Sequence, residues 1–458
     1  MIMARSFNKF RDLTRLKPAT PLRLVCVQIV PCGDNFPEVT ERRSVSWHFV
    51  SQLEVAVPTR LEPRGIALYR LLIALLLFLK MLCQADQPTA LASNALPSVA
   101  YTNARVRTIP WSIHVVRLQR NSALYEIDSI HAGGKAIGLE TLSEQLTRPA
   151  PALGMAVAGL NGDFYQRDKT FAGAPRGLQI ISGELISAPC GGATFWLDAV
   201  GQCHTTNVAS RFRVTWPNGV TTGFGLNGEL PPEGIELYTP AIGSSTHSAG
   251  GRELVLTRVE GSRWLPLRIG QNYVARVSEI RETGNTSLTP DTLVLSLTAA
   301  ALTKLPSAQV GMLLRLSTET EPALHGVRAA IGGGPILIQG GKRQKVRASS
   351  SEAYEFSSML ERHPRSAIGW NSSYFFLVEV DGRQKALSVG MTLDELTKFF
   401  EDLGCDNALN LDGGGSATLW YAGQVQNSPC DRAEREIANG IGIFKKRIDS
   451  GTAGAHNP

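Results

Sequence analysis

The hydrophobic positions from residue 111 onward fall into short runs separated by turn residues, a pattern typical of β-strands. A buried-type run at residues 155–160 leads into a polar cluster that contains Asp163. Residues 374–380 predict a hairpin strand that turns back at Asp381-Gly382, because Asp-Gly between strands is a common hairpin turn. Further strands are predicted at residues 113–118 and 125–130 with a turn between them, at 336–339 and 440–444, and as hairpins at 177–186 and 194–201.

Two segments have the period of a helix instead. Residues 393–403 place their apolar side chains on one face, Thr392 and Glu395 match a capping box at its start, and Gly404 is placed to end it. Residues 141–146 predict a shorter, capped helix. The predicted fold class is therefore α+β, with a strand-rich mixed-sheet core, few helices and an inserted β-rich region.

The pattern predicts one large domain behind an N-terminal export signal. Residues 211–329 contain many short strand candidates but no distinctive polar cluster, so we expect them to be a β-rich insertion in that domain. The predicted organisation is an extension at 1–63 that is disordered or precedes the true start, a signal peptide at 64–85, a linker at 86–110, the large domain at 111–446 and a disordered tail at 447–458.

The export signal is inferred from residues 71–79, a run of nine uncharged apolar residues. Such a run is too short to span a bilayer but fits a signal peptide, with Arg60, Arg64 and Arg70 before it and small residues for cleavage after it. A buried helix or a short membrane anchor is the alternative. The predicted location is periplasmic or extracellular, with membrane contact only through the signal. Because such a signal normally opens a protein, translation is expected to start near residue 57 or 61.

The positive charge of the chain is concentrated at its beginning. Ten of the 46 Lys and Arg residues but only six of the 40 Asp and Glu residues lie in the first 64 positions, so the rest is nearly neutral. No basic stripe interleaved with aromatic residues is present, and a nucleic-acid partner is not predicted.

Four of the seven cysteines follow the predicted signal. An even number in an exported protein permits disulfides, and the pairings Cys190 with Cys203 and Cys405 with Cys430 are the simplest of three arrangements. The histidines are scattered without metal-ligand spacing, so a zinc site is not predicted.

The most distinctive segment runs from Asn410 to Ser416, where three successive glycines separate an apolar run from a strand-like run. Glycines allow positive φ, and their amides can then form a concave site for an anion. Asn410 and Asp412 are two residues apart, so on a strand their side chains would share a face. The alternative interpretation is a permissive turn with a solvated Asp412.

Seven motifs occur in order along the chain: Asn161-Gly162-Asp163-Phe164-Tyr165, Ile331-Gly332-Gly333-Gly334-Pro335, Arg365-Ser366-Ala367-Ile368-Gly369, Val380-Asp381-Gly382-Arg383, Gly390-Met391-Thr392-Leu393, Asn410-Leu411-Asp412-Gly413-Gly414-Gly415-Ser416 and Asn427-Ser428-Pro429. Together they resemble the motifs of the phosphodiester glycosidase domain family, the family of the lysosomal uncovering enzyme N-acetylglucosamine-1-phosphodiester alpha-N-acetylglucosaminidase. The resemblance covers roughly residues 111–444 and is weakest through 211–329. It implies an α+β fold and hydrolysis of the bond between a sugar's anomeric carbon and a phosphodiester oxygen.

This reaction assigns roles to residue types. A phosphodiester leaves as an anion, so groups that stabilise negative charge matter more than a strong acid. The glycine amides would supply them, and Arg365 would add a clamp on the phosphate. A carboxylate must act on the anomeric carbon or on water, and Asp412 is preferred to Asp163. The predicted catalytic residues are Asp412, Asp163 and Asn410, and the predicted substrate-binding residues are Asn161, Gly333, Gly334, Arg365, Gly413, Gly414, Gly415, Ser416, Asn427 and Arg435.

Two other functions are compatible with these motifs. One is a non-catalytic protein that binds carbohydrate or polyphosphate, and the other is a glycosidase that acts on linkages without phosphate and needs a paired acid. The expected partner is a sugar phosphodiester or a glycan. No metal is assigned, although carboxylates such as Asp412 and Asp163 would favour calcium or magnesium.

Overall fold

The computed structural model describes residues 30–31, 97–148, 153–168, 170–249, 251–346, 358 and 360–447. From residue 98 onward these residues belong to one compact unit. The predicted signal peptide and, apart from its first residue, the predicted tail lie outside them. So does the predicted extension, except for β1 (Val30–Pro31), which pairs with β2 (Val99–Val106). No helix in the described part of the chain has the length and hydrophobicity needed to cross a membrane.

The described residues form four β-sheets and few helices, which confirms the predicted α+β class. Sheet 1 has the order β1-β2-β3-β23-β22-β24-β20-β21 and sheet 2 the order β26-β25-β5-β27-β4. Beyond β1 and β2, sheet 1 consists of β3 (Trp111–Gln119), β23 (Tyr374–Val380), β22 (Arg365–Trp370), β24 (Asn407–Asn410), β20 (Ile336–Gln339) and β21 (Lys342–Arg343). Sheet 2 consists of β26 (Gln424–Val425), β25 (Leu419–Tyr421), β5 (Met155–Asn161), β27 (Asn439–Lys445) and β4 (Tyr125–His131).

Sheets 3 and 4 are built from the middle of the chain. Sheet 3 has the order β18-β9-β8-β19-β6-β7, and sheet 4 the order β11-β10-β17-β15-β14-β16-β13-β12. Sheet 3 consists of β18 (Thr320–Glu321), β9 (Cys203–Ser210), β8 (Cys190–Leu197), β19 (Ala329–Gly332), β6 (Gln179–Ile181) and β7 (Glu184–Ser187). Sheet 4 consists of β11 (Thr221–Gly223), β10 (Arg213–Thr215), β17 (Leu313–Ser317), β15 (Asn272–Arg281), β14 (Arg252–Arg258), β16 (Leu293–Leu297), β13 (Ile235–Tyr238) and β12 (Gly225–Leu226).

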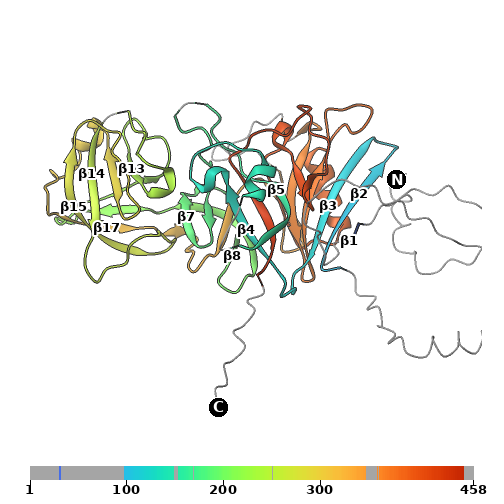
Figure 1. Cartoon of the computed structure of the whole chain (residues 1–458), viewed down its shortest axis with the longest axis horizontal. Coiled ribbons are helices and arrows are strands. Elements are labelled where there is room, and N and C mark those ends of the chain that lie inside the picture. Colours follow the sequence, from blue (N-terminus) through green and yellow to red (C-terminus); the bar gives the residue numbers. More distant parts are fainter. Residues whose placement is uncertain are drawn as a thin grey trace, which may run out of the picture. The chain divides into compact units, whose positions relative to one another are not determined.

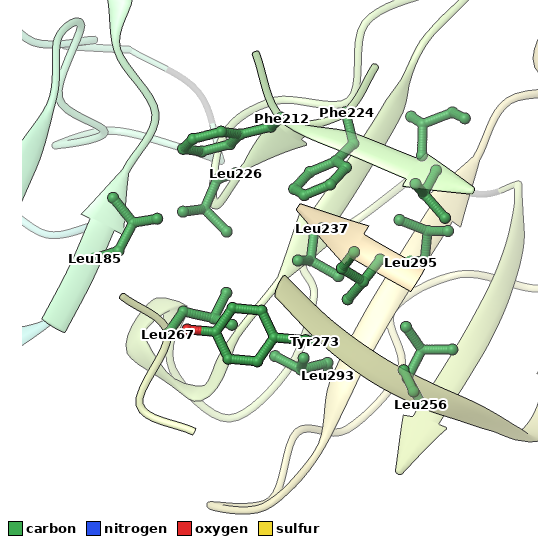
Figure 2. Packing of buried hydrophobic residues seen from close by; sticks show 14 of the residues in the cluster. Leu185, Phe212, Phe224, Leu226, Leu237, Leu256, Leu267, Tyr273, Leu293 and Leu295 are labelled. Atoms are coloured by element: carbon green, nitrogen blue, oxygen red, sulfur yellow. The ribbon is translucent and has the colours of Figure 1, made fainter. Parts of the chain in front are cut away.

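Every strand of sheet 4 comes from the segment predicted as a β-rich insertion, and β15 lies between β14 and β17 (Figure 1). Its apolar side chains form a core in which Phe224, Leu237, Leu256 and Leu295 are buried (Figure 2). Leu185 of β7 belongs to the same core, so sheet 3 also contributes to it. A second core joins sheets 1, 2 and 3 and includes Val116, Leu160, Phe195, Leu377 and Leu409.

Both predicted helices are present with the predicted caps. In α3 (Leu142–Thr147) and α6 (Leu393–Asp402), a threonine side chain accepts a hydrogen bond from the backbone of a glutamate three residues later. That glutamate bonds back to the threonine amide, so two otherwise unpaired amides are satisfied at each helix start.

Two local predictions, the linker at 86–110 and the hairpin at Asp381-Gly382, are wrong. The predicted linker at 86–110 contains β2, which pairs along its whole length with β3. The two strands predicted at 113–118 and 125–130 and the turn between them are present, but β3 pairs with β23 in sheet 1 and β4 pairs with β27 in sheet 2. No strand returns after Asp381-Gly382, and β23 pairs with the preceding β22 instead.

The predicted disulfides are also wrong. Cys190, Cys203, Cys405 and Cys430 are all free thiols. The register of β8 and β9 places Cys190 opposite Ala209 and Cys203 opposite Leu197. The two cysteines therefore lie near opposite ends of the hairpin, roughly 20 Å apart at about 3.3 Å per residue, which is far beyond the reach of a disulfide.

Candidate active site

Three loops that follow strands of different sheets meet at the predicted site. Asp163 follows β5, the second glycine cluster ends β19, and Asp412 follows β24. The amide of Asp412 donates to Gly162 O (2.9 Å), and the amide of Gly334 donates to Asn410 O (2.8 Å). Position 332 must be glycine, because a Cβ there would clash with Oδ2 of Asp163.

Asp163 is buried and held by backbone amides. Its Oδ2 accepts from Gly177 N (2.7 Å) and its Oδ1 from Phe164 N (2.8 Å). The pKa of Asp163 is raised to about 7, mainly by burial and in part by the charge of Asp412, while the two backbone bonds oppose the shift. The side chain of Asp163 therefore joins the backbone of two segments beside Asp412.

Asp412 lies at the opening of the glycine loop. Its Oδ1 accepts from Gly413 N (2.9 Å). Burial raises the pKa of Asp412, whereas the Ser416 hydroxyl and the positive charges of Arg435 and Arg176 lower it. Arg435 is anchored by Asp431, with 3.0 Å between Arg435 Nε and Asp431 Oδ2.

Four of the glycine amides that were predicted to bind an anion donate to groups of the protein. Gly413 N donates to Asp412 Oδ1, and Gly414 N donates to Pro364 O (3.0 Å). In the second cluster, Gly333 N donates to Ala193 O (3.0 Å), and Gly334 N donates to Asn410 O. These four donors are occupied by the protein itself. The glycines serve close packing instead: a Cβ at Gly415 would clash with the guanidinium of Arg435.

The three asparagines of the predicted site differ in which side-chain atoms lack a hydrogen-bond partner. Asn161 donates to Asp412 O (2.7 Å) and accepts from Ser366 Oγ (2.5 Å), so it joins two loops. Asn427 accepts from the backbone of Leu419 (2.9 Å) and donates to that of Ala417 (3.1 Å). Both asparagine side chains therefore hold loops of the site, and their predicted contact with substrate stays a prediction.

Asn410 keeps one free acceptor. Its Nδ2 donates to Gly334 O and Leu411 O, both at 2.8 Å, whereas its buried Oδ1 has no hydrogen-bond partner. Asn410 lines the pocket described next, so a substrate hydroxyl is a suitable partner for this oxygen.

A pocket of about 140 Å³ opens beside Asp412. Its lining contains one carboxylate, Asp412, and three basic side chains, His363, Arg365 and Arg383. The other residues that line it are Phe164, Gly334, Pro335, Ser358, Leu393, Asn410, Leu411, Gly413 and Gly414.

The three basic groups are held in different ways. Arg365 is buried and donates to three backbone carbonyls, those of Met391 (2.9 Å) and Glu361 (2.9 Å) and, at closer range, Ser358. Burial lowers its pKa to about 10, and the charge of Arg383 adds to this effect. Burial also lowers the pKa of His363, to which both arginines contribute.

His363 and Arg383 were missed by the sequence predictions. Arg383 Nη2 lies 3.3 Å from His363 Nδ1, although 20 residues separate them. The available signal was their position beside two motifs, since Arg383 ends Val-Asp-Gly-Arg and His363 stands two residues before Arg365.

The residues around Asp163 and Asp412 do not fit calcium or magnesium. Calcium takes about six to eight oxygen ligands, and magnesium takes about six, several of which are usually waters. Both oxygens of Asp163 already accept backbone hydrogen bonds. The pocket adds the amide oxygen of Asn410, but it also holds two arginines and a histidine, whose positive charge disfavours a cation.

A strand-rich fold that carries a carboxylate beside basic side chains defines a candidate hydrolase of anionic substrates. Residues 273–444 match the model of the family described as phosphodiester glycosidase. This match confirms the predicted resemblance over that segment, which includes Asp412, Arg365 and Arg383.

Two solved structures share the fold. One is a hypothetical protein from Synechocystis, with a TM-score of 0.62 and 22% identity over 77% of this chain and 64% of that one. The other comes from Burkholderia pseudomallei K96243 and is described as a candidate exported protein, with a TM-score of 0.56 and 22% identity over 73% of this chain and 74% of that one. At such identity, the likeness shows the fold alone.

Two further relatives carry less information. An uncharacterized SPbeta prophage-derived protein of Bacillus subtilis (strain 168) is 30% identical over 119 residues, which is 26% of this chain and 18% of that protein. The zebrafish N-acetylglucosamine-1-phosphodiester alpha-N-acetylglucosaminidase catalytic domain, auto-inhibited by its pro-peptide, has a TM-score of 0.39 and 16% identity over 77% of this chain and 85% of that one. A TM-score at this level supports no argument about fold or function.

Proposed function

We propose that the protein is an exported hydrolase that cleaves the bond between a sugar's anomeric carbon and a phosphodiester, with substrates similar to N-acetylglucosamine-1-phosphodiesters. The observation that carries this proposal is the lining of the pocket, where Asp412 faces the same space as His363, Arg365 and Arg383. The family match of residues 273–444 supports the same reaction class.

The basic side chains suit a phosphodiester. Arginine binds phosphate oxygens through charge-assisted hydrogen bonds, and Arg383 is the arginine of the pocket whose guanidinium is exposed. Arg365 is engaged with backbone carbonyls, so it contributes positive charge from behind the pocket wall rather than the predicted clamp. These charges favour departure of the phosphodiester as an anion.

Asp412 is the group we assign to the anomeric carbon, either as nucleophile or as base toward water. An alkoxide leaving group would need a second carboxyl group as acid. Among the described residues that line the pocket, Asp412 is the one carboxylate. The composition of the pocket therefore favours a phosphodiester over a neutral glycosidic linkage. Asp163, which has no free oxygen, is a positioning residue, and Asn410 Oδ1 would accept a hydrogen bond from a sugar hydroxyl.

Export rests on the apolar run at residues 71–79, which lies outside the described residues. Mass spectrometry of the protein secreted from its native host tests this part separately. We expect the mature N-terminus near residue 85 and no peptides from residues 7–47. Recovery of those peptides from the mature protein would contradict the proposed start and processing.

The activity is tested with the purified full chain and a p-nitrophenyl phosphodiester of N-acetylglucosamine. We expect release of free sugar, and loss of that release in Asp412→Ala. The p-nitrophenyl glycoside without phosphate is the matched substrate, and a higher rate on it would support a conventional glycosidase. Binding of the phosphodiester without any turnover in the wild type would support a binding protein. EDTA in a parallel reaction tests the requirement for a metal.

A further inference from the structure

A second cluster of polar residues lies inside the protein, away from the residues that line the pocket. Glu379 of β23 and His114 of β3 are directly paired across the two strands, and Asp381 follows β23. One ligand-type atom from each of the three residues lies within 4.8 Å of the other two. All three residues are buried, with Glu379 at 0% and Asp381 at 1% exposure.

Two carboxylates and a single histidine make up this cluster. His114 Nε2 lies 3.0 Å from Asp381 Oδ2, and Asp381 Oδ1 accepts from Ser428 N (2.7 Å). Neither oxygen of Glu379 accepts a hydrogen bond. The side-chain amide of Asn427 lies beside Glu379 and donates to Ala417 O (3.1 Å). A buried carboxylate without donors costs several kcal/mol unless a proton or a cation neutralises it.

The surroundings of His114 match those of a metal-binding histidine. Its Nδ1 lies 2.7 Å from the hydroxyl of Tyr101, so this hydroxyl can accept Nδ1–H and leave the lone pair of Nε2 directed at the two carboxylates. Histidine ligands usually donate their second ring N–H in this way. Ser112 Oγ and Asn103 Nδ2 also lie 3.1 Å from Nε2, and they complete the polar wall of the cluster.

We propose that His114 Nε2, Glu379 and Asp381 bind one divalent transition-metal ion in a structural site. One nitrogen and two carboxylate oxygens suit zinc or manganese, whereas calcium prefers oxygen ligands alone. The ion replaces the missing partner of Glu379 and ties β3 to β23 and, through Asp381, to the backbone of Ser428. The sequence analysis predicted no zinc site because the ligands come from segments more than 260 residues apart, at 114 and at 379–381.

The site would also set the position of a pocket residue. Arg383 follows Asp381 by two residues and has a φ of 58°, a strained conformation for a side chain other than glycine. Fixing Asp381 therefore fixes the turn that presents Arg383. This proposal does not depend on the sugar chemistry, because metal binding and thermal stability are measured without a substrate.

The test uses the full chain, stripped with EDTA and dialysed, and titrated with zinc chloride, manganese chloride or calcium chloride by calorimetry. We expect one zinc or manganese ion per chain, a rise in melting temperature on binding, and much weaker binding of calcium. Glu379→Gln is expected to weaken binding by more than roughly 100-fold, since even removal of a second-shell partner weakens it about 10–100-fold. Glu236→Gln, which changes another buried glutamate in sheet 4, is the matched control and keeps wild-type affinity.

The alternative is a proton shared between the two carboxylates. In that case no ion binds, and Glu379→Gln is as stable as the wild type or more stable, because glutamine imitates a protonated glutamate. That result overturns the proposal, and so does binding that Glu379→Gln leaves unchanged, since the ion then lies elsewhere. If Glu379→Gln does not fold, Tyr101→Phe decides. It keeps all three ligands and is expected to weaken zinc binding by about 10-fold or more, and unchanged affinity in this variant counts against the site.

Discussion

The region around the pocket and sheet 4 place buried polar side chains in opposite settings. At the pocket, Asp163 and Asp412 lie at strand ends, where loops supply amides and open space. In sheet 4, Glu236 and Glu253 lie within strands and are both opposite Ser296 of β16. The amides of Gly228 and Thr286 reach them, but an apolar core rather than a pocket surrounds them. None of the residues that line the pocket comes from 211–329. The difference indicates that chemistry and stability are carried by separate parts of the chain.

The largest expected effect comes from the pocket carboxylate. Asp412→Asn removes the group assigned to the anomeric carbon, and kcat is expected to fall by about 10³-fold or more with the melting temperature nearly unchanged. Steady-state hydrolysis of the p-nitrophenyl phosphodiester measures it. Glu236→Gln is the control from sheet 4 and keeps kcat within about twofold, since a residue outside the pocket contributes no transition-state contact. A variant at position 412 that kept a tenth of the activity would remove Asp412 from the reaction.

In the core of sheet 4, a substitution is expected to lower stability and leave kcat unchanged. Leu256 is fully buried on β14 opposite Leu293 (Figure 2), so Leu256→Ala leaves a cavity and costs about 2–5 kcal/mol of stability. Urea unfolding followed by tryptophan fluorescence measures the loss, and kcat of the protein that remains folded stays at the wild-type value. A large fall in kcat would show that sheet 4 and the pocket are coupled, and the comparison would then fail.

The sequence predicted local features well and distant ones poorly. The capping boxes of α3 and α6 were predictable because every partner lies within four residues. The loop carrying Asp412 was predictable because its residues are contiguous. The pairings of β3 with β23 and of β4 with β27 were not, since more than 240 residues separate the two strands of each pair. The glycine amides were predicted to bind an anion because their acceptors are distant in sequence and could not be predicted. One such acceptor is Pro364 O, which accepts from Gly414 N.

A pH-dependent effect on stability is expected in sheet 4. Burial raises the pKa of Glu236 to about 8, and its one protein donor is Gly228 N (2.7 Å). The unfolded chain loses this proton near pH 4.5, whereas the folded chain keeps it to about pH 8. The folded state thus binds more protons between these values, and stability falls as pH rises through that window.

Glu236→Gln tests this effect by removing the titration. The wild type is expected to lose on the order of 2 kcal/mol from this group between pH 5 and pH 8, whereas the variant loses correspondingly less. Urea unfolding at several pH values measures both slopes. Because the introduced glutamine retains an oxygen for Gly228 N, the variant is expected to be the more stable protein above pH 7. Equal slopes would show that Glu236 is ionised throughout the window.

The smallest expected effect is a change in KM when Arg383 is replaced. It distinguishes binding of phosphate by a placed side chain from attraction by the net positive charge of the protein. Arg383→Gln removes a guanidinium that lines the pocket, and KM for the phosphodiester is expected to rise about tenfold, which corresponds to roughly 1.4 kcal/mol for a partly solvated charge-assisted hydrogen bond. Arg281→Gln is the matched control, because Arg281 pairs with Glu279 on β15 and lies outside the pocket lining. Inhibition by inorganic phosphate gives a second readout, since phosphate lacks the sugar. A loss confined to Arg383 shows that the pocket binds phosphate through a placed side chain, whereas equal losses in both variants show that only the net charge of the protein attracts the substrate.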